Sequence, residues 1–402
     1  MPHDASAATR PIRTVAALGT AQTLAWASSY YLPALLALPM ARDLGVSTPT
    51  VFAAFSLALI VAAAVGPWSG HMIDRHGGRP VLMGTNLMFA VGLVGLAWAH
   101  DAFGLFAAWA VIGLAMGSGL YEAAFATLVH LYRLRARNVI TGITLIAGFA
   151  STIGWPLTAL LEAWLGWRGA CLVWAALHLV LGLPLNASLP RALLGADEVK
   201  GGAARSATAD DFTAQRPWLT TGLLALVFAL TWFISTAMAA HLPRVVEAAG
   251  ASLTVAVSVG ALVGPAQVGG RLLEFGLLRH IHPLLSARLA ALAHPLGVVA
   301  LMAVGAPAAA LFAILHGAGN GILTIAKGTL PLVFFGAHGY GARQGWMMVP
   351  ARVAQALAPF LFGLAVDRWG AGALWLSGAL GLIALVVLLL LRRRYISPGA
   401  GG

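Results

Sequence analysis

Long apolar runs separated by short polar stretches follow one another along the whole chain. A helix that crosses a bilayer needs about 20 mostly apolar residues, and runs of that length with few charged residues predict twelve membrane-spanning helices. The charge-free run at 289–326 is too long for one crossing. Its break is expected at Gly305-Ala306-Pro307, because glycine and proline interrupt helices. The twelve spans are expected at 14–40, 50–73, 80–99, 102–131, 138–161, 169–190, 217–243, 253–278, 283–304, 308–335, 341–366 and 370–391.

A polar segment at 191–216 divides the twelve spans into two halves. The halves match at an offset of about 200 residues: Gly66-Pro67 with Gly264-Pro265, Gly117-Ser118-Gly119 with Gly319-Asn320-Gly321, Gly142 with Gly345, and Pro156 with Pro359. Parallel repeats of this kind place a substrate site between the halves, near the middle of the membrane. The sequence therefore predicts an all-α membrane protein with twelve transmembrane helices in two pseudo-symmetric six-helix bundles, at 1–190 and 217–402, joined by a cytoplasmic linker.

Composition agrees with a membrane protein and argues against several other classes. The 402 residues are 60% hydrophobic and 9% charged, whereas soluble domains carry roughly 25% charged residues. The single cysteine, Cys171, excludes an internal disulfide and a CxxC metal site, and no histidines pair at metal-ligand spacing. The net charge of +11 does not indicate nucleic-acid binding, because the basic residues form short clusters between apolar runs.

The basic clusters predict the orientation in the membrane. Cytoplasmic loops carry an excess of Lys and Arg, and most of the 24 such residues fall on one side if both termini are cytoplasmic. We therefore expect a multi-pass protein of the bacterial inner (cytoplasmic) membrane that keeps its first span and acts as a monomer. Its expected partners are the lipid bilayer and a small-molecule substrate, with no cofactor and no nucleic acid.

The polar turn between the second and third spans carries the most specific motif. It contains Gly70, Asp74-Arg75, Gly77 and Arg79. Gly70 permits close helix approach, Asp74 can face a helix N-terminus or a cation, and Arg75 and Arg79 hold the loop on the cytoplasmic side. The motif resembles the loop signature of the major facilitator superfamily of transporters, except that Gly78 replaces the first of two basic residues. The resemblance implies that Gly70, Asp74, Arg75 and Arg79 form a latch for the outward-open state.

Charged residues within the spans are few, and each is costly in lipid, so each is a candidate functional residue. Glu122 lies in the fourth span, Lys327 in the tenth and Arg352 in the eleventh; the only other lysine is Lys200 in the linker. We expect Lys327 and Arg352 to bind an anionic group, and Glu122 to carry a proton or orient the amine. The alternative is a structural ion pair between Glu122 and Lys327 that only neutralises two buried charges.

A second resemblance concerns the fifth span. Tyr132 to Arg137, followed by Gly142 and Ala147-Gly148, is similar to the fifth-helix signature of the monocarboxylate porter family, although the Asp-Gly pair expected before the first helix is replaced by Leu18-Gly19. The resemblance implies that an arginine of the eighth helix binds the substrate carboxylate, which makes Arg271 the candidate. The alternative is that Arg271 reaches the cytoplasmic surface and pairs with Glu274.

Polar and aromatic side chains complete a candidate cavity. Gln22, Trp26, Ser29 and Tyr30 recur on one face of the first span. Residues of other spans could join this face, or they could serve only for packing between helices. They are Tyr121, Trp232, Asn320 and Trp346.

These features favour a secondary active transporter of a small, monocarboxylate-like organic anion that works by alternating access and is coupled to protons. No GxxxxGK[ST] motif indicates ATP-driven transport. A transporter of a neutral or amphipathic solute, such as a vitamin or drug, is the alternative. An intramembrane enzyme built on Ser118 is disfavoured because the repeat places Asn320 at the equivalent position, so no catalytic residue is expected.

Overall fold

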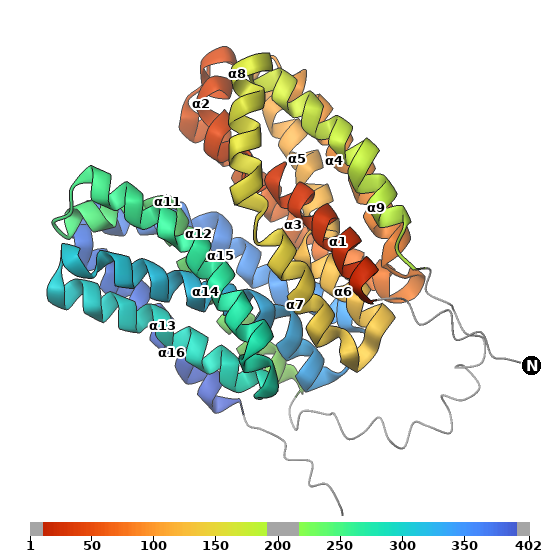
Figure 1. Cartoon of the computed structure of the whole chain (residues 1–402). Coiled ribbons are helices and arrows are strands. Elements are labelled where there is room, and N and C mark those ends of the chain that lie inside the picture. The colour runs from red at the N-terminus through yellow and green to blue at the C-terminus, as the bar shows by residue number, and fades with distance from the viewer. Residues whose placement is uncertain (1–10, 191–216, 392–402) are drawn as a thin grey trace, which may run out of the picture.

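The computed structural model describes residues 11–190 and 217–391, and all of its regular elements in these ranges are helices (Figure 1). The linker expected at 191–216 lies outside the described residues. The first half contains α1 (Pro11–Ala27), α2 (Pro33–Asp43), α3 (Thr48–His76), α4 (Gly78–Ala97), α5 (Ala102–Gly119), α6 (Tyr121–Tyr132), α7 (Ala136–Ala147), α8 (Ala150–Leu177) and α9 (Leu183–Ala187). The second half contains α11 (Pro217–Ala248), α12 (Leu253–Gly276), α13 (Pro283–Val304), α14 (Ala309–Phe335), α15 (Tyr340–Trp369) and α16 (Ala373–Leu390).

The twelve predicted crossings are present, but several are not single helices. Nine apolar helical stretches of the described chain are long enough to cross a membrane, and two of these, at 136–187 and 340–390, are long enough for two crossings each. The broken stretch formed by α1 and α2 supplies the remaining crossing. The chain thus has the predicted fold class, an all-α membrane protein.

The expectation of unbroken spans is wrong at several places in the first half. The span at 14–40 is interrupted at 28–32 before Pro33 starts α2, because proline fits the first turn of a new helix. The span at 102–131 is split at Leu120, whose backbone is extended. The span at 138–161 is divided between α7, which ends at Ala147, and α8, which begins at Ala150. Gly166, with φ of 67°, bends α8 in the expected gap between the fifth and sixth spans, a conformation that glycine adopts without steric cost.

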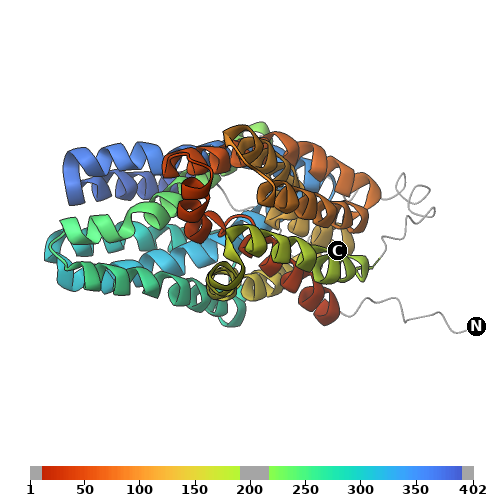
Figure 2. The same ribbon diagram turned by 90° about the horizontal axis from the view of Figure 1, so that it is seen from above.

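The two halves form separate groups of helices that touch along two lines (Figures 1 and 2). Helix α3 packs along α15, and α7 packs against α12 and α14, whereas α2 and α8 pack mainly on helices of their own half. We call the end at which the α3–α4 and α14–α15 turns lie the closed end. The groups diverge toward the opposite, open end, which carries α2 and the α11–α12 turn (Figure 1).

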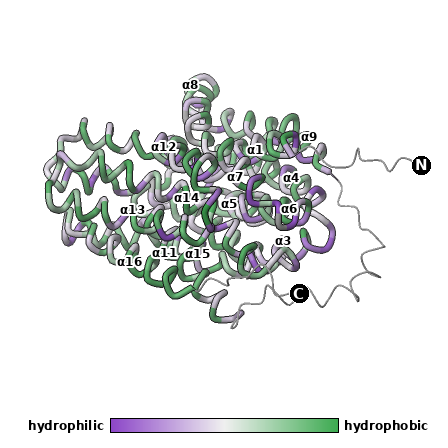
Figure 3. Tube along the Cα trace, turned by 60° about the horizontal axis from the view of Figure 1, so that its bottom comes forward, coloured by the Kyte–Doolittle hydropathy of each residue, from purple (hydrophilic) through white to green (hydrophobic). Residues whose placement is uncertain are grey.

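Apolar residues predominate along the helices of both groups (Figure 3). Large side chains such as Trp68, Val180 and Leu390 are more than half exposed. Exposed apolar side chains in such numbers are expected where lipid replaces water as the surrounding solvent. The polar and charged side chains that are buried therefore mark the places where function can be sought.

Candidate functional site

Aromatic side chains from both halves meet between the two bundles. Trp26 of α1 and Trp232 of α11 lie with nearly parallel rings, 7° apart and with centroids separated by 6.3 Å. The ring centroid of Tyr121, which follows the break after α5, lies 4.9 Å from that of Trp26, and the ring centroid of Tyr30 lies 5.2 Å from it. The structure thus brings together four of the aromatic residues that the sequence singled out.

Lys327 lies beside this group. It projects from α14 and is 5% exposed, and its Nζ is 4.1 Å from the centroid of the Trp232 ring. The guanidinium of Arg352 on α15 lies 5.6 Å from the same ring. Within the described residues Nζ of Lys327 has no hydrogen-bond or ion-pair partner, and the face of the Trp232 indole lies where it can stabilise the protonated amine.

Glu122 does not pair with Lys327, so the alternative of a structural ion pair between these two residues is wrong. The carboxylate of Glu122 instead accepts a hydrogen bond of 2.8 Å from Nη2 of Arg352. Nη1 of Arg352 donates to Oε1 of Gln355 at 3.1 Å. The pair joins α6 of one bundle to α15 of the other, in a small cleft that Gly66, Gly117 and Gly345 keep open.

Arg271 does not pair with Glu274, which corrects the alternative that it reaches the surface. Its side chain is buried, and its Nε has no partner among the described residues. A methyl group placed on Gly148 of the other bundle would collide with its guanidinium. Glu274 accepts hydrogen bonds from Arg137 of α7, at 3.0 Å, and from Ser286. Arg271 therefore points toward the N-terminal bundle at the end of α7.

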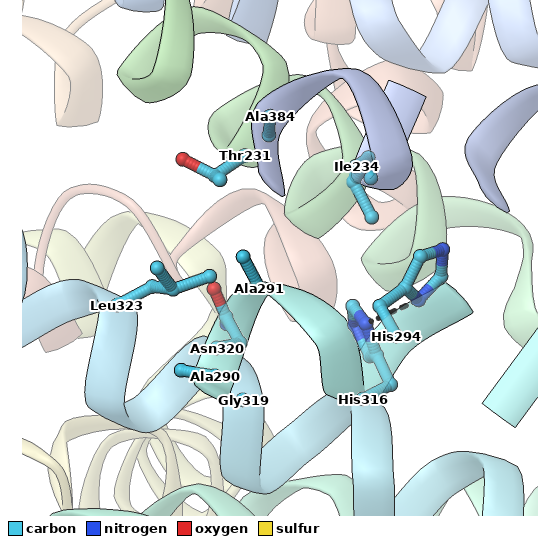
Figure 4. Close-up of a pocket in the computed structure, with 11 residues that line it drawn as sticks. Thr231, Ile234, Ala290, Ala291, His294, His316, Gly319, Asn320, Leu323 and Ala384 are labelled. Atoms are coloured by element: carbon cyan, nitrogen blue, oxygen red, sulfur yellow. Dashed lines mark hydrogen bonds between the residues drawn. The ribbon is translucent and has the colours of Figure 1, made fainter. Parts of the chain in front are cut away.

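The remaining predicted cavity residues lie elsewhere. Asn320 lines a cavity inside the C-terminal bundle together with Thr231, His294 and His316 (Figure 4). Trp346 is 68% exposed on α15, so its predicted place in the cavity is wrong. The contact between His294 and His316 was missed, because the two are 22 residues apart and only the antiparallel pairing of α13 and α14 makes them neighbours.

Several buried donors around the aromatic group have no partner within the described chain. They include Nε1 of Trp26, Nε1 of Trp232 and Nε of Arg271. A buried donor without a partner costs about 1–3 kcal/mol. Together with the unpaired amine of Lys327, these groups form a site that a ligand rich in acceptors would satisfy.

The motif of the α3–α4 turn lies at the closed end, against α15. The carboxylate of Asp74 accepts hydrogen bonds from the backbone N–H groups of Gly341 and Ala342, both at 2.9 Å. Gly70 touches the backbone of Gly341, where any side chain would collide. Arg75 is exposed and Arg79 half-buried beside the same turn. An acid of one bundle thus caps a helix N-terminus of the other, which is favourable for the charge and for the unpaired N–H groups.

A second contact closes the same end. Arg137, at the start of α7, pairs with Glu274 and also donates to the carbonyls of Leu278 and Ile281, which follow α12. A cation of the N-terminal bundle thus meets the carbonyl end of a helix in the C-terminal bundle. The two contacts, Asp74 with α15 and Arg137 with α12, hold the bundles together on both sides of the central site.

Comparison with known proteins agrees with this architecture. The chain is 25% identical over 385 residues to the gentisate transporter of Corynebacterium glutamicum, covering 89% of this chain and 83% of that one. A shorter match, 35% identical over 145 residues, is to monocarboxylate transporter 11 of Mus musculus, with 35% of this chain and 31% of that one covered.

The fold resembles that of the proton:xylose symporter XylE, with a TM-score of 0.76, 15% identity, and coverage of 94% of this chain and 95% of that one. The family model of the Major Facilitator Superfamily matches residues 18–312. The match covers most of the chain, including the loop motif, the break after α5 and the first helices of the second half. The chain therefore belongs to the Major Facilitator Superfamily.

Proposed function

We propose that this chain is a secondary active transporter of a small organic monocarboxylate, coupled to protons. The observation that carries the proposal is Lys327, a buried amine with no anionic partner of its own. A charge in the middle of a span costs about 2.5–3.5 kcal/mol, and a carboxylate bound in the central site would offset that cost. Arg352 and Arg271 supply further positive charge around the site.

The aromatic residues favour a carboxylate that carries a ring. Trp26, Trp232, Tyr30 and Tyr121 line the site with flat apolar surface, and both indoles offer unpartnered N–H donors. Two of the relatives are named for a gentisate and a monocarboxylate transport activity. Gentisate is an aromatic carboxylate with two hydroxyl groups, so it matches both the cations and the donors.

Coupling to protons follows from linkage at two groups. A carboxylate that binds beside Lys327 stabilises the protonated amine, so the anion and a proton bind together. Protonation of Glu122 would release Arg352 and remove the ion pair between α6 and α15, which frees Arg352 for the substrate and loosens the contact between the bundles. Either effect couples proton binding to the transport cycle.

Alternating access uses the two halves, 1–190 and 217–402, as bodies that rock about the central site. The closed end is assigned to the cytoplasm, since the basic residues of the α3–α4 turn and of η2 (Arg133–Arg135) lie there and cytoplasmic loops are rich in arginine. The described state is then outward-open, and Gly70 and Asp74 act as its latch. Both termini are assigned to the cytoplasmic side of the inner membrane.

Uptake of labelled gentisate by proteoliposomes with an acidic exterior tests the proposal. Lys327→Ala and Arg352→Ala each remove one cation, and a lost charge-assisted hydrogen bond lowers uptake roughly tenfold to a hundredfold. Lys200→Ala, at the only other lysine of the chain, is the matched control and is expected to transport at the wild-type rate.

Competition with unlabelled compounds defines the substrate class. Benzoate and lactate are expected to compete, and benzyl alcohol is not. Undiminished transport by both cation variants, or equal competition by the neutral alcohol, would refute the anion site and favour a transporter of neutral solutes.

A further inference from the structure

Two histidines form a buried pair inside the C-terminal bundle, away from the central site. His294 of α13 and His316 of α14 are 6% and 4% exposed, and their Nδ1 atoms are 3.1 Å apart (Figure 4). Nε2 of His294 lies 3.1 Å from Oγ of Ser377 on α16. Neither histidine contacts the central site, and ionisable residues within membrane-spanning helices are candidates for proton pathways.

The hydrogen-bond partners assign the protons on the two rings. Ser377 donates to the carbonyl of Leu374, so its oxygen accepts from Nε2–H of His294. Nδ1 of a neutral His294 is then the acceptor, and Nδ1–H of His316 is the donor. This leaves a lone pair on Nε2 of His316, which has no partner within the described residues. The pair can therefore accept one more proton, with the shared Nδ1 contact intact.

A polar stripe connects the pair with Lys327. His316, Asn320, Thr324 and Lys327 follow one another at intervals of four, four and three residues on α14, and therefore share a face of the helix. The cavity beside them, lined also by Thr231, extends from His316 to Leu323 and can hold water (Figure 4). His316 lies about 16 Å from Lys327 along the axis, on the side of the open end.

Among the residues that the structure describes, no other titratable group lines this cavity, so proton binding in it takes place at the two imidazoles. The charged groups on the helices packed around α14 are distant from the cavity or are bound to other groups. On α12, Glu274 is bound to Arg137 and Arg271 faces the other bundle. On α13, Arg288 is bound to carbonyls at the end of α16. On α11, the segment that lines the cavity, around Thr231, carries no charge, and α16 has none.

We propose that the His294–His316 pair is a proton relay that supplies Lys327 from the open end. A proton from outside forms an N–H bond at Nε2 of His316 and makes the pair positive. That N–H bond then breaks, the proton passes along water molecules beside Asn320 and the hydroxyl of Thr324, and a new N–H bond forms on Nζ of Lys327. The pair returns to neutral and Lys327 becomes an ammonium as the carboxylate arrives. This role rests on the proposed function of Lys327 and assigns its proton a route separate from Glu122.

The test separates coupling from transport. Proteoliposomes with His316→Gln are compared with wild type in two assays: gentisate counterflow at equal pH on both sides, and gentisate accumulation driven by a pH gradient. Counterflow is expected to persist and gradient-driven accumulation to be lost. His178→Gln is the matched control, because His178 is equally buried in the N-terminal bundle, between Ser28 and Asn86, and should keep both activities. Wild-type accumulation by His316→Gln would overturn the relay.

A second measurement does not depend on transport. Solid-state NMR of ¹⁵N-histidine protein in bilayers reports the protonation of each imidazole, with His316→Gln and His294→Gln assigning the signals. One added proton shared by the pair is expected as the pH is lowered. Two imidazoles that stay neutral while the protein remains folded would overturn the relay, even if gentisate proves not to be transported. Failure of gentisate counterflow in the wild type, by contrast, would count against the proposed function.

Discussion

Asp74 joins the bundles through two backbone N–H groups, at Gly341 and Ala342. Asn at this position offers one oxygen and no charge, so Asp74→Asn keeps one of the two bonds. Loss of an N-terminal cap costs about 1 kcal/mol, which lowers the ratio of outward-open to inward-open protein roughly fivefold. Spin labels at Leu38 of α2 and Val255 of α12, both exposed at the open end, report this ratio as a distance distribution after Cys171→Ala. Asp101→Asn is the control, because Asp101 caps α5 within its own bundle; an equal shift in both variants would contradict the latch.

Helices α3 and α15 approach each other closely only because glycines face each other at the contact. A side chain at Gly70 would collide with the backbone of Gly341, which cannot move aside without moving the helix. Gly70→Ala is therefore expected to separate the helices and to cost about 1–3 kcal/mol, seen as a lower melting temperature in detergent. Gly84→Ala in α4 meets nothing within 4 Å and should be neutral or stabilising by up to about 1 kcal/mol. Equal melting temperatures for the two variants would show that the α3–α15 contact is loose.

Two charged contacts at the closed end, on both sides of the site, help to hold the whole molecule in its described state. Arg137→Gln leaves Glu274 buried without a cation, which costs about 3–5 kcal/mol. Combined with Asp74→Asn, it is expected to reverse the preference between the two states, since effects at separate sites add. The same spin-label pair should then show the short, open-end-closed distance as the main population. Arg137→Gln with Glu274→Gln should recover part of the outward-open population. A double variant that keeps the wild-type distances would show that other contacts hold the closed end.

The sequence by itself determined the class of fold and the position of the loop motif. Twelve crossings can be counted because lipid cannot hydrogen-bond the backbone, so each crossing must be a long apolar helix. The resemblance to the family could be recognised from Gly70 and Asp74-Arg75, because these residues lie close together in the sequence. Lys327 and Arg352 could also be identified as candidate site residues, because a charged residue within an apolar segment is recognised from the sequence alone.

Only the tertiary structure decided which charges meet. Glu122 and Arg352 are 230 residues apart and pair because α6 lies against α15. Lys327 therefore has no carboxylate partner, and its amine lies over the ring of Trp232. The contact between His294 and His316 depends in the same way on the pairing of α13 with α14. Sequence spacing fixes neighbours along one helix, whereas the partner of a buried charge is set by the rotation and depth of two helices that pack against each other. The rotation and depth of a helix depend on packing over the whole bundle, so no short stretch of sequence predicts them.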